Sequence, residues 1–309
     1  MGHPDVKYLF LNGEFVDYEE AKIHVLTPSV KYGATVYEGI RGYWMAEENQ
    51  LNLFRLDDHL NRLFQSMELT WMKFLYTTEQ FKDFIIELIK KNGFKEDIHI
   101  RIMILVISDD GSMISTEPMG SAIAALPMGR ISKKSETGLS CAVSSWRRIS
   151  DNSTPPRIKC AGNYQNSRLA AIQASLDGYD NVLILNENGK LSEGAGSNIF
   201  IVRNGIPITP SVSNNILEGI TRDSLIHLFK EKIGLNPIER DIDRTELYIA
   251  DEVFYCGSAM EVVPIVSIDK HLIAKGKVGP ITNRIKSCYL DVVRGNDPDY
   301  EKWRTPVYK

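Results

Sequence analysis

The sequence predicts a mixed α/β protein with some α+β character, and three observations lead to that class. The chain has 309 residues, of which 43% are hydrophobic and 25% are charged, as in ordinary folded domains. Apolar residues recur at helical spacing over residues 56–67 and 78–92, whereas residues 98–107 alternate as a strand does. Helical and extended patterns continue to alternate after residue 139, which is typical of this class.

The length also bears on domain organisation. At roughly 150 residues per domain it favours two domains, with one large α/β domain as the alternative. Residues 127–138, PMGRISKKSETG, combine proline, glycine, lysine and serine without periodicity, which is typical of a linker. We therefore expect a smaller N-terminal domain over residues 1–126, an interdomain linker over 127–138 and a larger C-terminal domain over 139–309.

The elements of the N-terminal part follow from local signals. Asn12 and Gly13 stand between two apolar runs and both tolerate positive φ, so a β-hairpin is expected there. Thr77 and Gln80 have the spacing of a capping box for the helix over residues 78–92.

The alternating strand that follows has an unusual pair of polar residues. Over residues 98–107 it places His99 and Arg101 on the same face, opposite a row of isoleucines. A second strand over residues 121–126 precedes the linker. Two polar side chains thus share one face of a strand that otherwise has a buried pattern.

The C-terminal part continues with further strands and helices. We expect a strand over residues 139–146, a helix over 164–176, strands on both sides of residues 191–197, a helix that begins after Gly219, two strands joined at 257–259, and a last helix that begins at 279–280.

Charge and motif content exclude several functions. The 36 Lys and Arg residues against 40 Asp and Glu give a net charge of −4 without a basic stripe, so no nucleic-acid or anionic-lipid partner is expected. Nothing approaches the ~20 apolar residues of a membrane span, and the N-terminus lacks an apolar signal core. The four cysteines form no CxxC pair and the six histidines no HExxH motif, so no metal is expected. These features predict a reduced, cytoplasmic protein.

Lys159 is the first candidate for chemistry. It lies between a Pro-Pro loop and the predicted helix start at residue 164, which places it at the end of an element. A lysine that is partly buried there can act as a nucleophile toward a carbonyl. A solvated loop lysine is the alternative.

Two glycine segments could bind an anion. In residues 216–222, ILEGITR, Gly219 comes just before a helix, where backbone N–H groups and the positive end of the helix dipole favour a phosphate. Residues 257–259, GSA, could add a hydroxyl and two amides. An ordinary helix entry and an ordinary hairpin turn explain the two segments equally well.

Two further segments could contact a ligand. Glu193 stands among small residues in LSEGAGSN, where it could pair with a protonated ring nitrogen or simply occupy a turn. Residues 32–41, YGATVYEGIR, combine aromatic residues with glycines and could form a pocket wall or a packed, tyrosine-rich loop.

Taken in order, six motifs resemble the pyridoxal-phosphate enzymes of fold type IV, and most closely the branched-chain amino acid aminotransferases. The motifs are YGATVYEGIR at 32–41, HLNRLFQSM at 59–67, KCAGNY at 159–164, LSEGAGSNIF at 191–200, ILEGITR at 216–222 and CGSAMEVVPI at 256–265. The resemblance spans nearly the whole chain. It implies a small N-terminal α/β domain, a larger C-terminal mixed β/α domain and pyridoxal 5'-phosphate as cofactor.

The resemblance also implies roles for the cofactor-binding residues. Lys159 would be the catalytic lysine that forms the internal aldimine, Glu193 the partner of the pyridinium nitrogen, and Tyr164 the hydrogen-bond donor to the phenolic oxygen. Leu217 would pack against the ring. The phosphate would bind Arg62, Gly219, Ile220, Thr221 and Ser258.

The substrate pocket implied by the resemblance is made by Tyr32, Tyr37, Gly39, His99, Arg101, Met128, Ile131 and Ala259. Arg101 matches the arginine that receives the distal carboxylate of glutamate, and Arg41 would support the pocket from behind. The chain departs from the family at His99, where a tyrosine is common, and at Met128 and Ile131, where a tryptophan and a tyrosine are common.

The function implied is a ping-pong transfer of the amino group between branched-chain L-amino acids and 2-oxoglutarate, as used in branched-chain amino acid biosynthesis. The resemblance also implies a homodimer or a higher homo-oligomer, in which residues 109–113 approach a neighbour's pocket. Alternatives within the fold are an (R)-amine or D-amino acid transaminase and an aminodeoxychorismate lyase. A protein that keeps the fold for binding alone is the non-enzymatic alternative.

Overall fold

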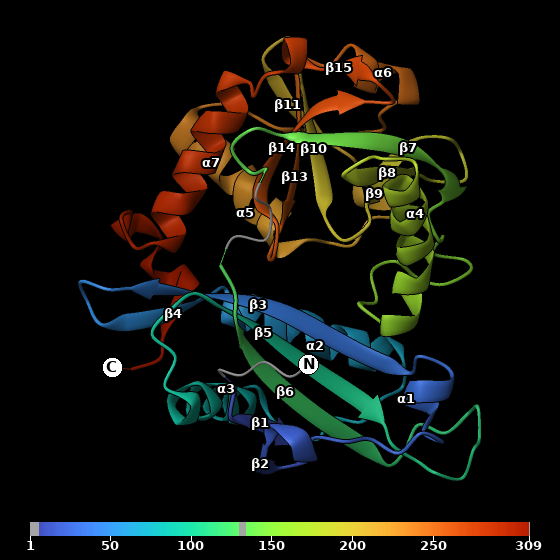
Figure 1. The fold of residues 1–309 in the computed structure, drawn as a ribbon, viewed down its shortest axis with the longest axis vertical. Coiled ribbons are helices and arrows are strands. Elements are labelled where there is room, and N and C mark those ends of the chain that lie inside the picture. The colour runs from blue at the N-terminus through green and yellow to red at the C-terminus, as the bar shows by residue number, and fades with distance from the viewer. Residues whose placement is uncertain (1–5, 130–133, 309) are drawn as a thin grey trace. The chain divides into compact units, whose positions relative to one another are not determined.

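A computed structural model describes residues 6–129 and 134–308 of the chain. By their internal contacts the residues form two compact units. Unit 1 comprises Met1–Gly129, Ile158–Gly162 and Val292–Lys309, and unit 2 comprises Arg130–Arg157 and Asn163–Asp291. Each unit contains one sheet with helices, which confirms the predicted α/β class (Figure 1). The exact domain boundaries given above stay a prediction.

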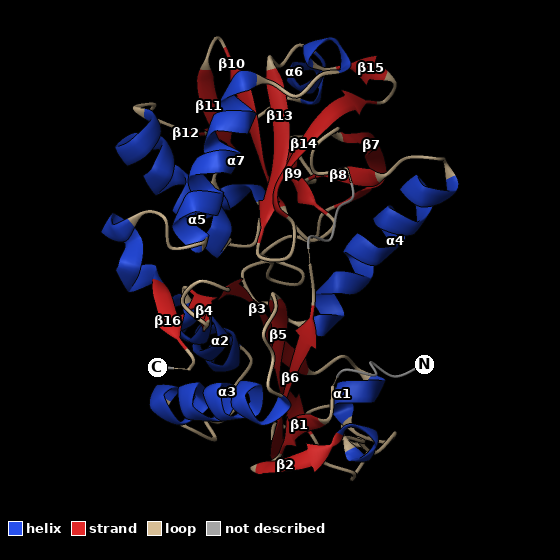
Figure 2. Cartoon of the chain, turned by 60° about the vertical axis from the view of Figure 1, so that its left-hand side comes forward, coloured by secondary structure: helices blue, strands red, loops and turns tan. Residues whose placement is uncertain are grey.

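Unit 1 is built on a seven-stranded antiparallel sheet with the order β16-β4-β3-β5-β6-β1-β2. Its strands are β1 (Tyr8–Leu11), β2 (Glu14–Asp17), β3 (Thr35–Met45), β4 (Gln50–Phe54), β5 (Ile98–Val106), β6 (Met119–Pro127) and β16 (Arg304–Pro306). Its helical segments include η1 (Tyr18–Glu20), α1 (Pro28–Lys31), α2 (Leu56–Leu69), α3 (Thr78–Asn92) and η6 (Pro298–Trp303). The helices α2 and α3 lie on the same face of the sheet (Figure 2).

The local signals in this part of the sequence are confirmed. Asn12 and Gly13 have φ angles of 51° and 99°, as the β1–β2 hairpin turn requires. The side chain of Thr77 accepts from the backbone N–H of Gln80, and the side chain of Gln80 accepts from the N–H of Thr77. Gly93 ends α3 in the left-handed conformation.

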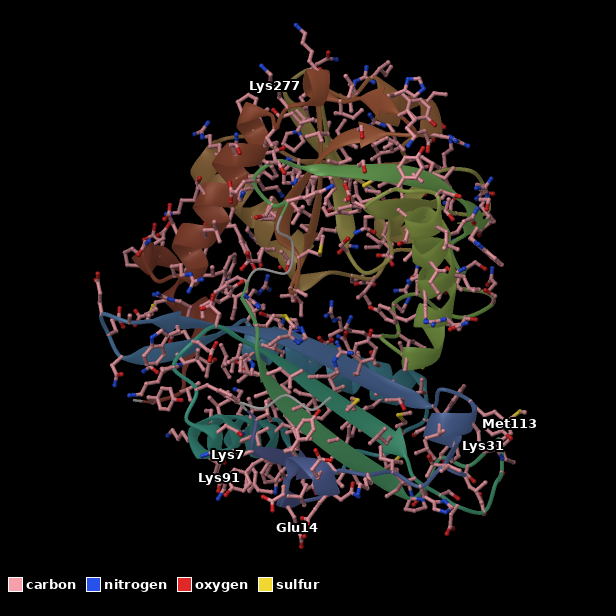
Figure 3. All side chains as sticks on the ribbon, in the orientation of Figure 1. Lys7, Glu14, Lys31, Lys91, Met113 and Lys277 are labelled. Carbon is pink, nitrogen blue, oxygen red and sulfur yellow. The ribbon has the colours of Figure 1, made fainter. Side chains whose placement is uncertain are left out.

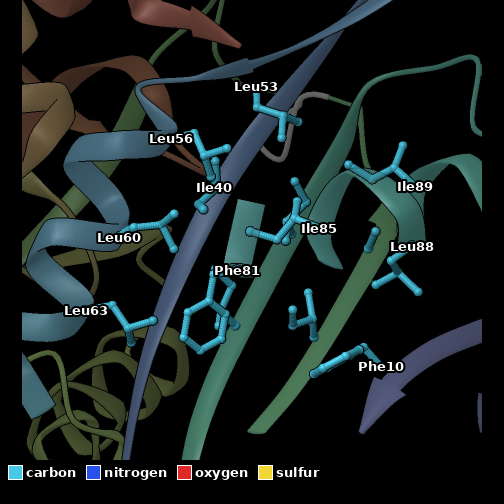
Figure 4. Close-up of a cluster of buried hydrophobic side chains, with 14 of the residues drawn as sticks. Phe10, Ile40, Leu53, Leu56, Leu60, Leu63, Phe81, Ile85, Leu88 and Ile89 are labelled. Carbon is cyan, nitrogen blue, oxygen red and sulfur yellow. The ribbon is translucent and has the colours of Figure 1, made fainter. Parts of the chain in front are cut away.

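The core of unit 1 lies between the sheet and its two helices (Figure 4). The fully buried side chains that meet there come from α2, α3 and the strands β1, β3, β4, β5 and β6, and include Phe10, Ile40, Leu53, Leu56, Leu60, Leu63, Phe81, Ile85, Leu88 and Ile89. Burial of each such side chain stabilises the unit by roughly 1.5–3 kcal/mol. This packing fixes α2 against β3 and thereby sets where the polar residues of α2 point.

One long strand was not predicted. Residues 35–45 form β3, which pairs with β4 on one side and β5 on the other, although part of this segment could also be read as a tyrosine-rich loop. Gly39 and Gly42 lower its strand propensity, and only the two neighbouring strands make it extended. The short C-terminal strand β16 was likewise not predicted.

Unit 2 contains a mixed sheet with the order β12-β11-β10-β13-β14-β7-β8-β9, and β15 pairs with β14. Its strands are β7 (Leu139–Arg147), β8 (Asn181–Leu185), β9 (Leu191–Gly194), β10 (Asn198–Arg203), β11 (Ile206–Thr209), β12 (Ile238–Glu239), β13 (Glu252–Gly257), β14 (Glu261–Ile268) and β15 (His271–Leu272). Its helical segments include α4 (Tyr164–Leu176), η3 (Val212–Asn214), α5 (Ile220–Leu228), η4 (Phe229–Ile233), α6 (Arg244–Tyr248), η5 (Ala274–Gly276) and most of α7 (Pro280–Val293); η2 (Ala161–Asn163) spans the boundary between the units.

Three helices of unit 2 hold predicted site residues or their neighbours in place. The helix α4 packs on β7 and β8, and α5 packs on β13. The carboxylate of Glu252 accepts from the N–H groups of Ile281 and Thr282 and so caps α7. Among the described residues, no helix is long and apolar enough to span a bilayer.

Candidate active site

The residues predicted to form the site fall into two groups, one in each unit. Unit 1 contains Tyr32, Tyr37, Gly39, Arg62, His99, Arg101, Met128 and Lys159. Unit 2 contains Tyr164, Glu193, Leu217, Gly219, Ile220, Thr221, Ser258 and Ala259. Ile131, also predicted for the substrate pocket, lies outside the described residues.

Lys159 is held against strand β3 by its backbone. The N–H of Tyr37 donates to its carbonyl at 2.9 Å, and its own N–H donates to Oγ of Ser66 at 3.2 Å. Its Nζ lies 4.7 Å from the centroid of the Tyr37 ring. The lysine is therefore a half-buried residue pinned to a sheet, which argues against a solvated loop lysine.

The ring of Tyr37 has a second cation beside it. Cζ of Arg101 lies 5.3 Å from the ring centroid. Arg101 is exposed on β5, directly opposite Gly39 of β3 in the antiparallel register. Three predicted substrate-binding residues and the predicted catalytic lysine are thus neighbours in unit 1.

His99 fills the space above Gly39. It is buried, and a Cβ at position 39 would lie 2.9 Å from its Nε2, so a larger residue there would displace the imidazole. Burial, with smaller contributions from Arg101 and Arg41, lowers the pKa of His99 to about 4. The imidazole is therefore neutral near pH 7, and the strand presents it and the charged Arg101 on one face.

Arg62 is bound by a carboxylate that the sequence analysis did not single out. Its Nε and Nη2 donate to the two oxygens of Glu38 at 2.7 and 2.9 Å, and Nδ1 of His59 lies 2.7 Å from Oε2. Burial alone raises the pKa of Glu38, but Arg62 and His59 outweigh it and hold the pKa well below its usual range. Burial lowers the pKa of His59, so neutral His59 donates to an ionised Glu38. The i, i+3 spacing of His59 and Arg62 on α2 is the sequence signal that could have joined them.

The start of the linker is bound by Arg41. This buried guanidinium donates from Nη1 to the carbonyls of Met128 and Gly129 at 2.6 and 3.2 Å. Met128 is half-buried, whereas Tyr32 at the end of α1 is 43% exposed.

In unit 2, Glu193 is the centre of a buried hydrogen-bond network. Nη2 of Arg148 lies 2.8 Å from its Oε1, and Oε2 accepts from Nδ2 of Asn198 and from the N–H of Leu217, both at 3.0 Å. Asn198 also donates to the carbonyl of Leu217 at 2.9 Å. Glu193, predicted to pair with the ring nitrogen, and Leu217, predicted to pack on the ring, are therefore neighbours in the structure.

The segment before α5 explains why glycine stands at position 219. Gly219 is the N-cap residue of α5, and a Cβ there would overlap Oδ1 of Asn198. Ile220 and Thr221 form the buried first turn of this helix, at the positive end of the helix dipole. This end of α5 has the properties of an anion site. Ser258 and Ala259 lie in the turn between β13 and β14, and Tyr164 is the first residue of α4.

Four residues of these networks were not predicted as site residues: Glu38, His59, Arg148 and Asn198. Glu38 and Asn198 stand inside motifs quoted above, but their burial is a property of the sheets. Arg148 lies in a polar segment without periodicity, and no local signal marks it.

No group of His, Cys, Asp or Glu suited to a metal ion occurs within residues 6–129 and 134–308.

The fold and both networks define an enzyme class, and comparison with known families identifies it. The family model described as amino-transferase class IV matches residues 35–268. The chain belongs to this family, which confirms the resemblance drawn from the six motifs.

Individual relatives are similar over nearly the full length. A probable branched-chain-amino-acid aminotransferase of Aquifex aeolicus is 43% identical over 304 residues, 97% of each chain. The structure of a branched-chain aminotransferase from Thermoproteus uzoniensis with norvaline is 42% identical, with a TM-score of 0.93, and the match covers 97% of this chain and 99% of that one. The branched-chain amino acid aminotransferase from Thermobaculum terrenum in its PLP-form is 40% identical, with a TM-score of 0.91 and coverage of 98% and 99%.

Proposed function

We propose that this protein is a pyridoxal-phosphate-dependent aminotransferase that transfers the amino group between branched-chain L-amino acids and 2-oxoglutarate by a ping-pong mechanism. One observation carries the proposal beyond family membership. The ring of Tyr37 has the amine of Lys159 at 4.7 Å and the guanidinium of Arg101 at 5.3 Å. A reactive amine, an aromatic wall and a carboxylate-binding cation thus occur together on one face.

The residues present fit the cofactor. Glu193 offers a buried carboxylate that two neutral donors and Arg148 already orient, as a partner of a pyridinium nitrogen requires. The first turn of α5, with Ile220 and Thr221, offers N–H groups for the phosphate. Because Gly219 has no side chain, a phosphate can approach the backbone at this end of the helix. In our proposal Arg62, Ser258 and Tyr164 complete the cofactor contacts, and Leu217 packs on the ring.

The chain's own groups then have distinct tasks. Bound pyridoxal phosphate supplies an electron sink that makes the proton on the substrate α-carbon acidic. Lys159 would hold the cofactor through its amine and would move that proton, and its backbone hydrogen bonds to Tyr37 and Ser66 keep the residue in place for this task. Glu193 holds the proton on the ring nitrogen.

The face of unit 1 that carries Tyr37, His99 and Arg101 explains how one pocket can accept the side chains of two different substrates. Tyr37, Gly39 and neutral His99 offer an uncharged surface to a branched aliphatic side chain. Arg101 offers a bidentate donor to the distal carboxylate of glutamate or 2-oxoglutarate. In our proposal Ala259 and Ser258 bind the substrate α-carboxylate, and Met128, fixed by Arg41, and Tyr32 border the pocket.

Half-reaction spectra test this function. The reconstituted enzyme is mixed with L-leucine, L-glutamate, D-alanine or an (R)-arylalkylamine, and the absorbance of the bound cofactor is followed. We expect conversion with the two L-amino acids and none with the other two donors. No change with L-leucine would contradict the branched-chain assignment, and conversion by the (R)-amine or D-alanine would favour the other transaminase class.

The lysine is tested with a matched pair of variants. Lys159→Ala should abolish conversion by L-leucine, because it removes the amine that moves the proton. Lys95→Ala removes an exposed lysine of the same unit and should leave the rate unchanged. Equal rates for Lys159→Ala and the wild type would refute the role of Lys159.

We further propose that the protein is a homo-oligomer, at least a dimer. Five exposed apolar residues lie before and within α1 and in the loop after β5, and we term them the apolar surface cluster: Val25, Leu26, Val30, Met113 and Ile114. Nζ of Lys31 donates to the carbonyl of Gly111 at 3.0 Å and so joins α1 to the loop that carries Met113 (Figure 3). Exposed apolar groups of this kind are typical of interfaces.

A cytoplasmic location stays a prediction from the sequence.

A further inference from the structure

Arg148 is a buried arginine that comes directly after the last residue of β7. Its N–H donates to the carbonyl of Leu185 at 2.8 Å, which fixes the backbone beside β8. Its Nη2 lies 2.8 Å from Oε1 of Glu193, and its Nη1 donates to Oγ of Ser167 at 3.1 Å. The guanidinium thus joins strand β9 to helix α4.

The register of the sheet explains this contact. Arg147 pairs with Leu185, and Ile184 pairs with Glu193, so β8 lies between the two strands that carry the ion pair. Arg148 therefore reaches across β8 to the carboxylate on β9. A side chain as long as arginine, with several donors in a rigid fork, can make both contacts at once.

Three of the donors to Glu193 differ in charge. Asn198 and the N–H of Leu217 are neutral and bind Oε2. Arg148 brings a full positive charge to Oε1. A guanidinium at hydrogen-bond distance stabilises the ionised form of a buried carboxylate much more than a neutral donor does.

Stability alone does not explain an arginine here. Within the part of the chain that the structure describes, its buried Nε has no hydrogen-bond partner. Buried ion pairs often contribute no more to stability than apolar residues of similar size, and a buried N–H without an acceptor costs further free energy. Such a residue is typical of a position kept for its effect on a neighbour.

We propose that Arg148 is a positioning residue that keeps Glu193 ionised, so that the proton shared with a bound pyridine ring stays on the ring nitrogen. This inference rests on the proposed function, because it assigns the electrostatic setting of the same cofactor contact. Arg148 has no contact with the ring in this role and acts through Glu193 and, through Ser167, on the helix that begins at Tyr164.

The physical reason is the competition of two bases for one proton. A buried carboxylate without a cationic neighbour is the stronger base and takes the proton, which leaves the ring nitrogen neutral. With Arg148 in place, the carboxylate is the weaker base and the ring carries the charge. A charged ring is the better electron sink.

The test follows the ring nitrogen directly, without turnover. Pyridoxal 5'-phosphate labelled with ¹⁵N in the ring is bound to the wild type and to Arg148→Gln, and the ¹⁵N resonance and the Kd of the cofactor are measured. We expect the resonance to move from the protonated toward the unprotonated position in Arg148→Gln. We also expect the Kd to rise about 10–100-fold, as for other groups that orient a ligand-binding residue.

Three variants serve as comparisons. Glu193→Gln removes the carboxylate and should give the unprotonated resonance. Arg147→Gln removes the exposed neighbouring arginine and should match the wild type in resonance and Kd. Arg148→Lys keeps the charge, so the ring should stay protonated while the Kd rises because the fork is lost. If Arg148→Gln does not fold, as judged by circular dichroism of the apoprotein, Arg148→Met, which also removes the charge and keeps a long side chain, carries the test.

The outcomes separate this inference from the proposed function. An unshifted resonance in Arg148→Gln beside a shifted one in Glu193→Gln would overturn the role of Arg148 and leave the proposed function intact. Equal shifts in Arg147→Gln and Arg148→Gln, or an unprotonated ring resonance in Arg148→Lys, would also overturn it. A wild type that binds no labelled cofactor would refute the proposed function itself.

Discussion

The buried histidine on β5 changes how the face of unit 1 responds to pH. His99 stands next to Arg101 and above Gly39, in a place where a charged imidazole would be poorly solvated. Neutral imidazole is therefore the form that fits the native structure. An imidazole at this position titrates between neutral and acidic pH, so the pH dependence of unit 1 includes a contribution from His99.

We predict that His99 makes unit 1 less stable in mild acid. Its pKa is lowered from 6.5 to about 4 in the native state, so the unfolded chain binds the proton first and stability falls as pH is lowered through this window. Between about pH 7 and pH 4 the free energy of unfolding should fall by about 3 kcal/mol from this residue.

Urea unfolding of the apoprotein at both pH values measures the effect. His99→Gln should show a pH dependence that is smaller by about this amount, whereas His24→Gln, which changes an exposed histidine of the same unit, should behave as the wild type. An equal pH dependence in all three proteins would contradict the prediction.

The carboxylate of Glu38 is the second residue whose charge matters. We predict that Glu38→Gln destabilises unit 1 by about 3–5 kcal/mol, because Arg62 would remain buried without its anionic partner. Since the native pKa is lowered, the stabilisation is present above the ordinary value of 4.5 and is lost as pH falls below it.

Urea unfolding of the apoprotein near pH 7 checks this prediction. Glu47→Gln, which alters an exposed carboxylate in the β3–β4 turn, is the control and should change stability by less than about 0.5 kcal/mol. A similar small effect for Glu38→Gln would show that the buried network contributes little.

At the scale of elements, the start of α5 couples a helix terminus to Glu193. Asn198 on β10 donates to Glu193 and to the carbonyl of Leu217. Its side chain also occupies the position that a Cβ at residue 219 would need. The helix terminus and the carboxylate therefore depend on one side chain. A larger residue at the N-cap position would therefore disturb Glu193 through Asn198, although the substituted residue itself is not one proposed to contact the ring.

We predict that Gly219→Ala weakens cofactor binding by about tenfold or more, because the new methyl group displaces Asn198 and thereby two of the hydrogen bonds that hold Glu193 and Leu217. Fluorescence titration of the apoprotein with pyridoxal phosphate measures the Kd. Gly196→Ala, at a position with open space and ordinary φ, is the control for adding a methyl group. Equal Kd values for the two variants would refute this coupling.

At the scale of the molecule, each unit has its own hydrophobic core. One core includes Ile40, Phe81 and Leu88, and the other includes Leu183, Ile199 and Tyr255. Because each unit has its own core, unfolding should be followed with a probe in each unit. The effects expected for His99 and Glu38 belong to unit 1.

We predict that the apolar surface cluster stabilises the oligomer. Met113 and Ile114 are 71% and 87% exposed, so their replacement by serine costs unit 1 little. If they are buried between subunits, Met113→Ser with Ile114→Ser should raise the dissociation constant at least about tenfold, since each side chain contributes roughly 1.5–3 kcal/mol.

Analytical ultracentrifugation over a range of concentrations measures that constant. Leu176→Ser removes an apolar side chain of unit 2 that is 83% exposed and should leave the constant unchanged. A wild type that is monomeric and fully active, or a double variant as tightly associated as the wild type, would contradict the prediction.

Much of the fold was predictable because its signals are local. The N-terminal hairpin follows from Asn12 and Gly13, and α3 from the capping box of Thr77 and Gln80. β3 was missed because its extended form depends on pairing with β4 and β5, and its two glycines weaken the local signal. The residues proposed for the cofactor could be chosen from motifs, since each motif is a short segment with its own chemistry.

The sequence by itself therefore determined the fold class, the family and the types of side chain available for the reaction. Only the tertiary structure decided which charges are paired: Arg62 with Glu38, and Glu193 with Arg148. Each of these pairs joins residues that are far apart in the chain and are brought together by packing or by strand register. Their ionisation is set by burial and by the neighbouring charge, and neither property is encoded in a local pattern of residues.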